Sequence, residues 1–246
     1  MSDVMLDKIR KLLAMAEDPA CTPAEAEAFT AKATRLIADH GIDEALLSRD
    51  DPGPVRSRLF DIPAPYAREK STLLSTVAAQ LRCSSVLHQR PTYDANHRAT
   101  NTFQVELFGH ESDLRLVEML HTSLLVQATR DVLRAQVPRG ESMAAYRRTW
   151  WLGFAGAIGL RLEEAERAAA AQAESRFAEA GTSTAIVLAD RRSQADVARD
   201  QAYPRLRTVS RSLSGSGGAD GWQAGQRADL GRAGRVGANV RAAVGT

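Results

Sequence analysis

The chain has 246 residues, of which 44% are hydrophobic and 5% aromatic, and its formal net charge is +2. This length allows a sizeable core in one or two domains, while no apolar run is long enough to cross a bilayer and no signal-type leader is present. The two cysteines, Cys21 and Cys83, exclude a disulfide framework and a four-cysteine zinc site. We therefore expect a soluble cytoplasmic protein.

The first forty-odd residues have the pattern of a two-helix hairpin. Apolar residues within 3–17 recur at spacings of three and four, which places them on one face of a helix. Thr22 and Glu25 predict a capping box at the start of a second helix, since each side chain can bond a free backbone N–H. Gly41 is expected to end the second helix as its left-handed cap, with Ile42 folding back on the helix end.

Three phrases of this hairpin carry a family resemblance: KIRKLLAMA at 8–16, PAEAEAF at 23–29 and AKATRLIADHGI at 31–42. They resemble the N-terminal module of the domain-of-unknown-function 2786 family, which occurs in actinobacteria, their phages and other organisms. The later phrase at 150–165 and the glycine-spaced C-terminus resemble longer members of that family. The family has no established activity, so the resemblance implies a small helical module and no particular chemistry.

The middle of the chain alternates between helical and strand patterns. Four prolines in the segment 48–65 predict a linker with a short edge strand near Leu59. The elements expected next are a helix over 66–82, strands over 84–89 and 103–107, and a long helix that reaches Gln136. This block is an α-β-β-α unit in which a hairpin of strands packs against helices.

A second long helix is expected over 141–180. Gly153, Gly156 and Gly159 each weaken a helix by about 1 kcal/mol relative to alanine, so their spacing predicts that another backbone passes close by. The remaining expected elements are a buried strand over 185–189, a short helix to about Ala202, a strand over 205–211, a flexible linker over 212–221 and a helix near 222–230.

These patterns predict a predominantly helical α+β protein with a small β-sheet. The expected division is a helical hairpin module over 1–47, a linker over 48–65, an α+β domain over 66–211 and a flexible Gly/Arg-rich region over 212–246.

Histidines near the expected hairpin of strands are the only candidates for chemistry. His88, His97 and His110 are candidates to converge with Cys83 or Asp94 in a metal or acid–base site. Their spacing matches no metal-ligand pattern, and serine-elbow, phosphate-loop and dinucleotide motifs are absent. We therefore expect no metal and no cofactor, and the alternative function of a hydrolase or metal-dependent enzyme depends on these histidines.

The C-terminal region is the stronger functional lead, because residues 181–246 hold 10 basic and 5 acidic side chains. Arginines can contact phosphates while an aromatic ring stacks on a base. The candidate nucleic-acid-binding residues are Arg205, Arg207, Arg211, Trp222, Arg227, Arg232 and Arg235. A plainer interpretation is the arginine bias of a GC-rich genome. Our main hypothesis is a non-enzymatic interaction protein that contacts nucleic acid, and a further alternative is an assembly protein that docks through the N-terminal hairpin.

Overall fold

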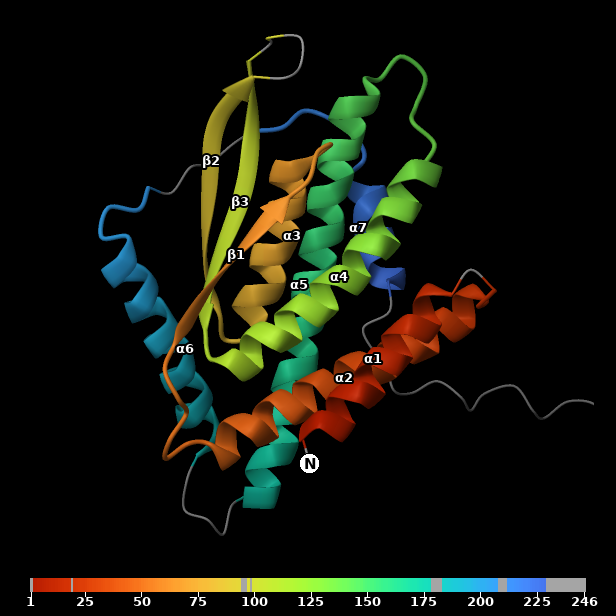
Figure 1. The fold of residues 1–246 in the computed structure, drawn as a ribbon. Helices are drawn as coiled ribbons and strands as arrows, with labels where there is room; N and C mark the ends of the chain where they lie inside the picture. Colours follow the sequence, from red (N-terminus) through yellow and green to blue (C-terminus); the bar gives the residue numbers. More distant parts are fainter. Residues whose placement is uncertain are drawn as a thin grey trace, which may run out of the picture.

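The computed structural model describes residues 2–18, 20–93, 97, 99–177, 183–207 and 212–228 (Figure 1). Within these residues the chain forms a predominantly helical α+β fold with a small antiparallel sheet, as the sequence predicts. The elements are α1 (Ser2–Glu17), α2 (Pro23–Leu47), β1 (Arg56–Ile62), α3 (Ala67–Gln80), β2 (Ser84–Tyr93), β3 (Ala99–Gly109), α4 (Glu111–Arg134), α5 (Met143–Phe177), α6 (Thr184–Ala202) and α7 (Gly218–Arg227).

The N-terminal hairpin consists of α1 and α2, and its predicted capping box is confirmed. The backbone N–H of Glu25 donates to the Thr22 hydroxyl at 3.3 Å, and the backbone N–H of Thr22 donates to the Glu25 carboxylate at 3.0 Å. Each side chain therefore satisfies a donor that the first turn of a helix leaves without an intrahelical partner.

The expectation that Gly41 ends the second helix is wrong, because α2 continues through Gly41 to Leu47. A Cβ at position 41 would lie 2.7 Å from Nη2 of Arg82 and 3.0 Å from Cδ1 of Leu116. Gly41 therefore makes room for the side chains of Arg82, which follows α3, and of Leu116 in α4. Ile42 does not fold back, and it is completely buried within the continuing helix.

The sheet has the strand order β1-β3-β2, with all neighbours antiparallel and β3 in the centre. Both predicted strands of the central hairpin are confirmed, as is the edge strand around Leu59. Val105 and Leu107 of β3 are buried in the main core, while Glu106 and Phe108 alternate to the opposite face. Helix α6 covers one end of that opposite face, and the other helices lie on the core side (Figure 1).

The predicted buried strand over 185–189 is wrong, because these residues belong to α6. Val187 and Leu188 pack against the apolar cluster around Ile42, whereas Ile186 is 69% exposed. An apolar run this short fits either a buried strand or one face of a helix, and tertiary contacts decide between them.

Helices α5 and α7 lie unusually close together. A Cβ at Gly153 would lie 2.0 Å from the carbonyl oxygen of Gly218, and one at Gly221 would lie 1.9 Å from that of Trp150. Gly153 thus does admit another backbone, whereas Gly156 and Gly159 make room for the side chains of Trp222 and Thr76, and the expected C-terminal helix is present. The region expected to be flexible from residue 212 contains this packed helix, while no strand forms over 205–207 and residues 208–211 lie outside the described part.

One main apolar cluster joins the hairpin to the rest of the chain. It contains Ile9 of α1 and Ile37 of α2 together with Leu74 of α3, Leu120 of α4 and Phe154 of α5. The described hairpin buries its apolar faces on α4 and α5. The division of the chain into separate domains near residue 47 therefore stays a prediction. None of the described helices combines the length and hydrophobicity needed to span a membrane.

Candidate functional site

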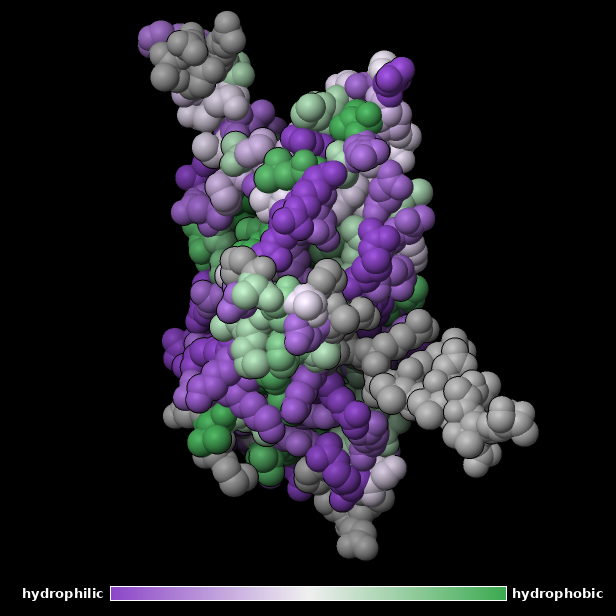
Figure 2. Space-filling view, turned by 90° about the vertical axis from the view of Figure 1, so that its right-hand side faces the viewer, coloured by the Kyte–Doolittle hydropathy of each residue, from purple (hydrophilic) through white to green (hydrophobic). Residues whose placement is uncertain are grey.

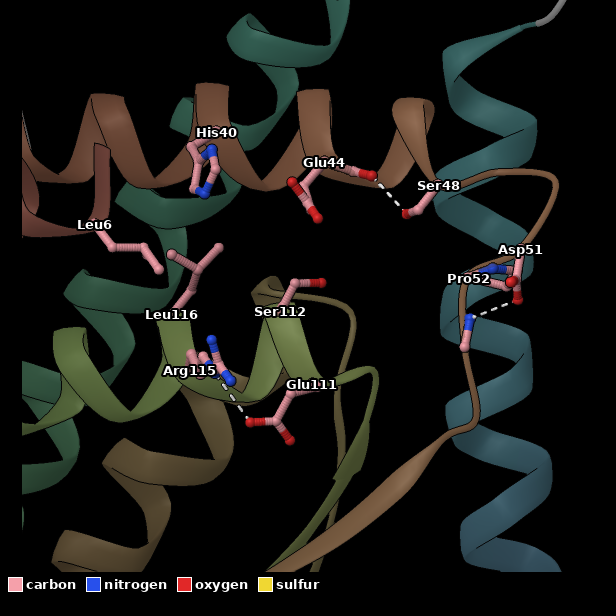
Figure 3. Close-up of a pocket in the computed structure, with 11 residues that line it drawn as sticks. Leu6, His40, Glu44, Ser48, Asp51, Pro52, Glu111, Ser112, Arg115 and Leu116 are labelled. Atoms are coloured by element: carbon pink, nitrogen blue, oxygen red, sulfur yellow. Dashed lines mark hydrogen bonds and ion pairs between the residues drawn. The ribbon is translucent and has the colours of Figure 1, made fainter. Parts of the chain in front are cut away.

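A cavity of about 340 Å³ lies between the hairpin and the start of α4 (Figure 3). Helix α2, the segment after it and the first two turns of α4 supply most of its lining. The lining residues are Leu6, His40, Glu44, Ser48, Asp51, Pro52, Gly53, Glu111, Ser112, Arg115 and Leu116. The cavity is therefore a mixed polar and apolar space at the junction of the N-terminal module and the larger remainder.

The hydroxyl groups of this cavity hold helices together and are not paired with a base. Ser48 Oγ donates to the main-chain carbonyl of Glu44 at 2.6 Å and accepts from Arg191 Nη1 at 3.2 Å. Ser112 Oγ accepts from Arg191 Nη2 at 3.0 Å. A nucleophilic serine needs a base to take its proton. These serines instead join α2 and α4 to α6 through one buried guanidinium group.

The carboxylate at the mouth of the cavity is also engaged. Glu111 accepts from Arg115 at 3.0 Å and from Arg58 at 2.9 Å. Burial acts to raise the pKa of Glu111, but the hydrogen bond from Arg115 and the charge of Arg58 outweigh it, so the pKa is lowered. This carboxylate therefore stays ionised and is poorly suited to act as a general acid.

Behind the cavity lies a buried network of four charged side chains that the sequence analysis did not foresee. Arg82 Nε and Nη2 both donate to Oδ1 of Asp113, at 3.1 and 2.8 Å, and Arg82 Nη1 donates to Glu166. Arg191 Nε lies 3.2 Å from Oδ2 of Asp113. Burial raises the pKa of Glu166 although Arg82 opposes this, and burial lowers the pKa of Arg191 although Asp113 opposes it.

The backbone at Arg82 explains how the network is positioned. Arg82 has φ 61°, a left-handed conformation that favours glycine, directly after the C-terminal cap of α3. The N–H of Cys83 donates to the carbonyl of Ala78 at 2.9 Å, which closes the helix end in the pattern of a Schellman motif. Arginine occupies a glycine-type position here, and its side chain is aimed into the buried network.

The three histidine candidates do not converge. His88 Nε2 lies 3.2 Å from Glu106, whose carboxylate also accepts from the Tyr203 hydroxyl at 2.5 Å. His97 is an exposed residue in the β2–β3 connection. His110 is buried at the start of α4, with Nδ1 3.1 Å from the carbonyl of Pro52.

Several positions of β3 separate the environments of His88 and His110. His88 pairs with Gln104 in the sheet, and the strand continues from there to Gly109 at about 3.3 Å per residue. Asp94, the other expected partner, lies outside the described residues. Within the described part of the chain, no group of three or more metal-binding side chains is close enough to hold an ion.

The structure separates the candidate nucleic-acid-binding residues. Arg205 and Arg207 are exposed after the end of α6, which lies on the opposite side of the sheet from α7 (Figure 1). Trp222 and Arg227 both lie on α7 but five positions apart, so they project about 140° from each other. The other three candidates, Arg211, Arg232 and Arg235, lie outside the described residues.

Arg227 instead has arginine neighbours that come from α4. Arg227, Arg130 and Arg134 are the positive charges that act on Asp131 of α4. Burial raises the pKa of Asp131, and the three arginines oppose this rise. We call Arg130, Arg134 and Arg227 the basic surface. It lies on the side of the molecule formed by α1, α4 and α7, where Figure 2 shows many hydrophilic side chains.

Comparison with known proteins identifies only the N-terminal part of the chain. No curated protein and no solved structure gives a significant match. A family model, described as protein of unknown function, matches 41 of the 246 residues. That match covers most of α1 and most of α2, including the capping box and Gly41. Residues 4–44 of this chain are thus a match to the DUF2786 family, as their resemblance to it implies.

Proposed function

We propose that the protein is a non-enzymatic interaction protein that contacts the phosphate groups of nucleic acid through the basic surface. The observation that supports this is that α7 lies against α4, so that Arg227 joins Arg130 and Arg134 among the positive charges that act on Asp131. These three arginines outnumber the one carboxylate on which their charges act. Arg134 and Arg227 are exposed, whereas Arg130 Nη2 donates to the main-chain carbonyl of Glu17 at 3.2 Å. Guanidinium groups bind phosphate oxygens with two parallel hydrogen bonds.

The sequence continues from this surface into a segment of the same charge. Helix α7 ends at Arg227, and the following residues 229–246 contain Arg232, Arg235 and Arg241 with Asp229 as the only acidic residue. The basic surface and the C-terminal segment would therefore present one continuous set of cations to a polyanion. Binding of this kind is electrostatic and independent of sequence, because it involves no base edges.

The test is fluorescence anisotropy of labelled single-stranded DNA, duplex DNA and RNA with the full chain between 50 and 300 mM salt. We expect Arg134→Glu/Arg227→Glu to weaken binding at least tenfold at low salt. It should also reduce the slope of log K against log salt by about 2 on duplex DNA, since each phosphate contact contributes about 0.9.

Arg205→Glu/Arg207→Glu is the matched control, because it makes the same change of charge on the other side of the molecule. Removing residues 229–246 should also weaken binding while leaving α7 in place. Absence of binding at 50 mM salt, or equal losses in the two double variants, would refute the basic surface as the site.

The alternative functions receive less support from the structure. The described histidines do not form a shared site, so no observation favours the hydrolase. Docking through the N-terminal hairpin is supported by three scattered exposed apolar residues, Val4 and Met15 of α1 and Leu47 at the end of α2.

A further inference from the structure

Helix α5 presents an apolar ridge to solvent between α3 and α7. Leu152, Gly156 and Leu160 follow each other at spacings of four, and the two leucines are 37% and 43% exposed. Trp222 of α7 lies over Gly156, where a Cβ would stand 3.3 Å from the Cζ3 atom of the indole ring, and Trp222 is itself 40% exposed. Two leucines and a tryptophan thus form one apolar surface, which we call the α5 ridge.

Opposite charges lie at the two ends of the α5 ridge. Arg148 precedes Leu152 by one turn, and Glu164 follows Leu160 by one turn. Both are exposed, and neither forms a hydrogen bond or ion pair with any residue that the structure describes. These two charges are about 24 Å apart along the helix axis at 1.5 Å per residue, so they do not pair within one molecule.

The order of these residues is symmetric about Gly156. Leu152 and Leu160 lie four positions to either side of it, and Arg148 and Glu164 lie eight positions to either side. A twofold axis near Gly156 that reverses the helix direction would place Leu152 opposite Leu160 of a second molecule. It would also place Arg148 opposite Glu164 at both ends, as a self-complementary interface requires.

Helix packing geometry permits this pairing. Ridges made of residues four apart are inclined about 26° to the helix axis, so two such ridges align when the helices cross at about −50°. This is the commonest crossing class in globular proteins. The absence of a side chain at Gly156 leaves room at the centre, and the indole ring of Trp222 fills part of that room.

We propose that the α5 ridge is the interface through which two copies of this chain form an antiparallel, twofold-symmetric dimer. The order of the charges favours a second copy of this chain as the partner. When a second ridge lies antiparallel to the first, the arginine of each ridge meets the glutamate of the other. Binding hot spots are often aromatic side chains near the centre of an interface, and Trp222 would lie near the centre of this one.

The dimer is independent of nucleic-acid contact. Trp222 belongs to the α5 ridge and Arg227 to the basic surface, and they project in different directions from α7. Failure of one proposal therefore leaves the other standing.

The test is sedimentation velocity of the full chain from 1 to 100 µM, with four variants that all change exposed side chains. We expect wild type to dimerise within this range, and Arg148→Glu or Glu164→Arg alone to raise the dissociation constant at least tenfold. The charge-swapped double variant Arg148→Glu/Glu164→Arg should return to within about threefold of wild type. Arg205→Glu, on the far side of the sheet, serves as the control and should leave dimerisation unchanged.

Three results would overturn the proposal. These are a wild-type chain that stays monomeric at 100 µM, single variants that dimerise like wild type, and a double variant that is no better than the single ones. If wild type is monomeric but a chain without residues 229–246 dimerises, the chain's own C-terminal segment covers the ridge. Quenching of tryptophan fluorescence by iodide gives a second readout. Trp150 and Trp151 are already buried, so iodide reaches mainly Trp222, and quenching should fall as a rising protein concentration buries Trp222 in the dimer.

Discussion

Arg82 and Asp113 form an ion pair in which two nitrogens of one guanidinium group donate to the same carboxylate oxygen, at 3.1 and 2.8 Å. Both side chains are almost completely buried. Arg82 follows the last turn of α3, and Asp113 lies in the first turn of α4, where the helix dipole favours a negative charge. The pair therefore joins the end of α3 to the beginning of α4, although β2 and β3 lie between these two helices in the sequence.

Removing Arg82 should be strongly destabilising. In Arg82→Ala, Glu166 loses its cation and Asp113 keeps only Arg191, and loss of one partner from a buried ion pair costs about 3–5 kcal/mol. Urea unfolding should show this loss as a lower midpoint. The control Arg167→Ala removes an exposed pair with Glu163 and should change stability by less than about 1 kcal/mol. Equal effects of the two substitutions would show that the buried network contributes nothing special.

The stability of the protein should depend on pH through His121. This residue is 7% exposed on α4, and burial lowers the pKa of its imidazole to about 4. In the unfolded chain the pKa of histidine is about 6.5. Between these values the unfolded state binds more protons, so stability is complete above pH 6.5 and decreases as pH falls toward 4, by about 3 kcal/mol.

His121→Leu removes this titration, because it replaces the imidazole by an apolar side chain of similar volume. The difference in unfolding free energy between wild type and His121→Leu should therefore change between pH 7 and pH 4.5. Parallel curves for the two proteins over this range would contradict the proposed titration.

Within α7, the packing on α5 should depend on Gly221 and should tolerate a side chain at Gly218. In Gly221→Ala the new Cβ would stand 1.9 Å from the carbonyl oxygen of Trp150, so α7 must move, and overpacking of this kind costs roughly 1–3 kcal/mol or more. At Gly218 the nearest atom is 3.8 Å away, so Gly218→Ala should be tolerated. Thermal unfolding and proteolysis of the C-terminal region would measure the difference, and similar behaviour of the two variants would count against this packing.

The two thiols should differ in accessibility. Cys83 is 3% exposed, and burial followed by the charge of Asp113 raises the pKa of its thiol. Cys21 is partly exposed in the connection between α1 and α2. Because the thiolate is the reactive form, a thiol reagent should modify one cysteine in the native protein and two after denaturation. Modification of both cysteines at native pH and temperature would show that the region around Cys83 opens readily.

The sequence predicted correctly those elements that depend only on residues close together in the chain. The capping box at Thr22 and the alternating residues of β3 are both determined by neighbours within a few positions, and both are confirmed. Gly41 has the same local signature as a helix cap, but the space requirement of Arg82 explains it instead. That requirement joins residues that are far apart in the sequence, so no short pattern could reveal it.

The candidate sites were less predictable for the same reason. Arg82 and Glu166 are separated by 84 positions, and Arg191 reaches Ser48 across 143 positions. The basic surface likewise forms because α7 returns to α4. Composition identified a basic C-terminal region, but only the fold shows which arginines of α4 accompany it.

The core shared by α1, α2, α4 and α5 means that the segment recognised by family comparison is smaller than the segment that folds. Ile9 and Ile37 are completely buried in a cluster that also contains residues of α3, α4 and α5. In this chain α4 and α5 supply the apolar platform on which the hairpin packs. The folding of the matched segment should therefore depend on helices that lie outside it.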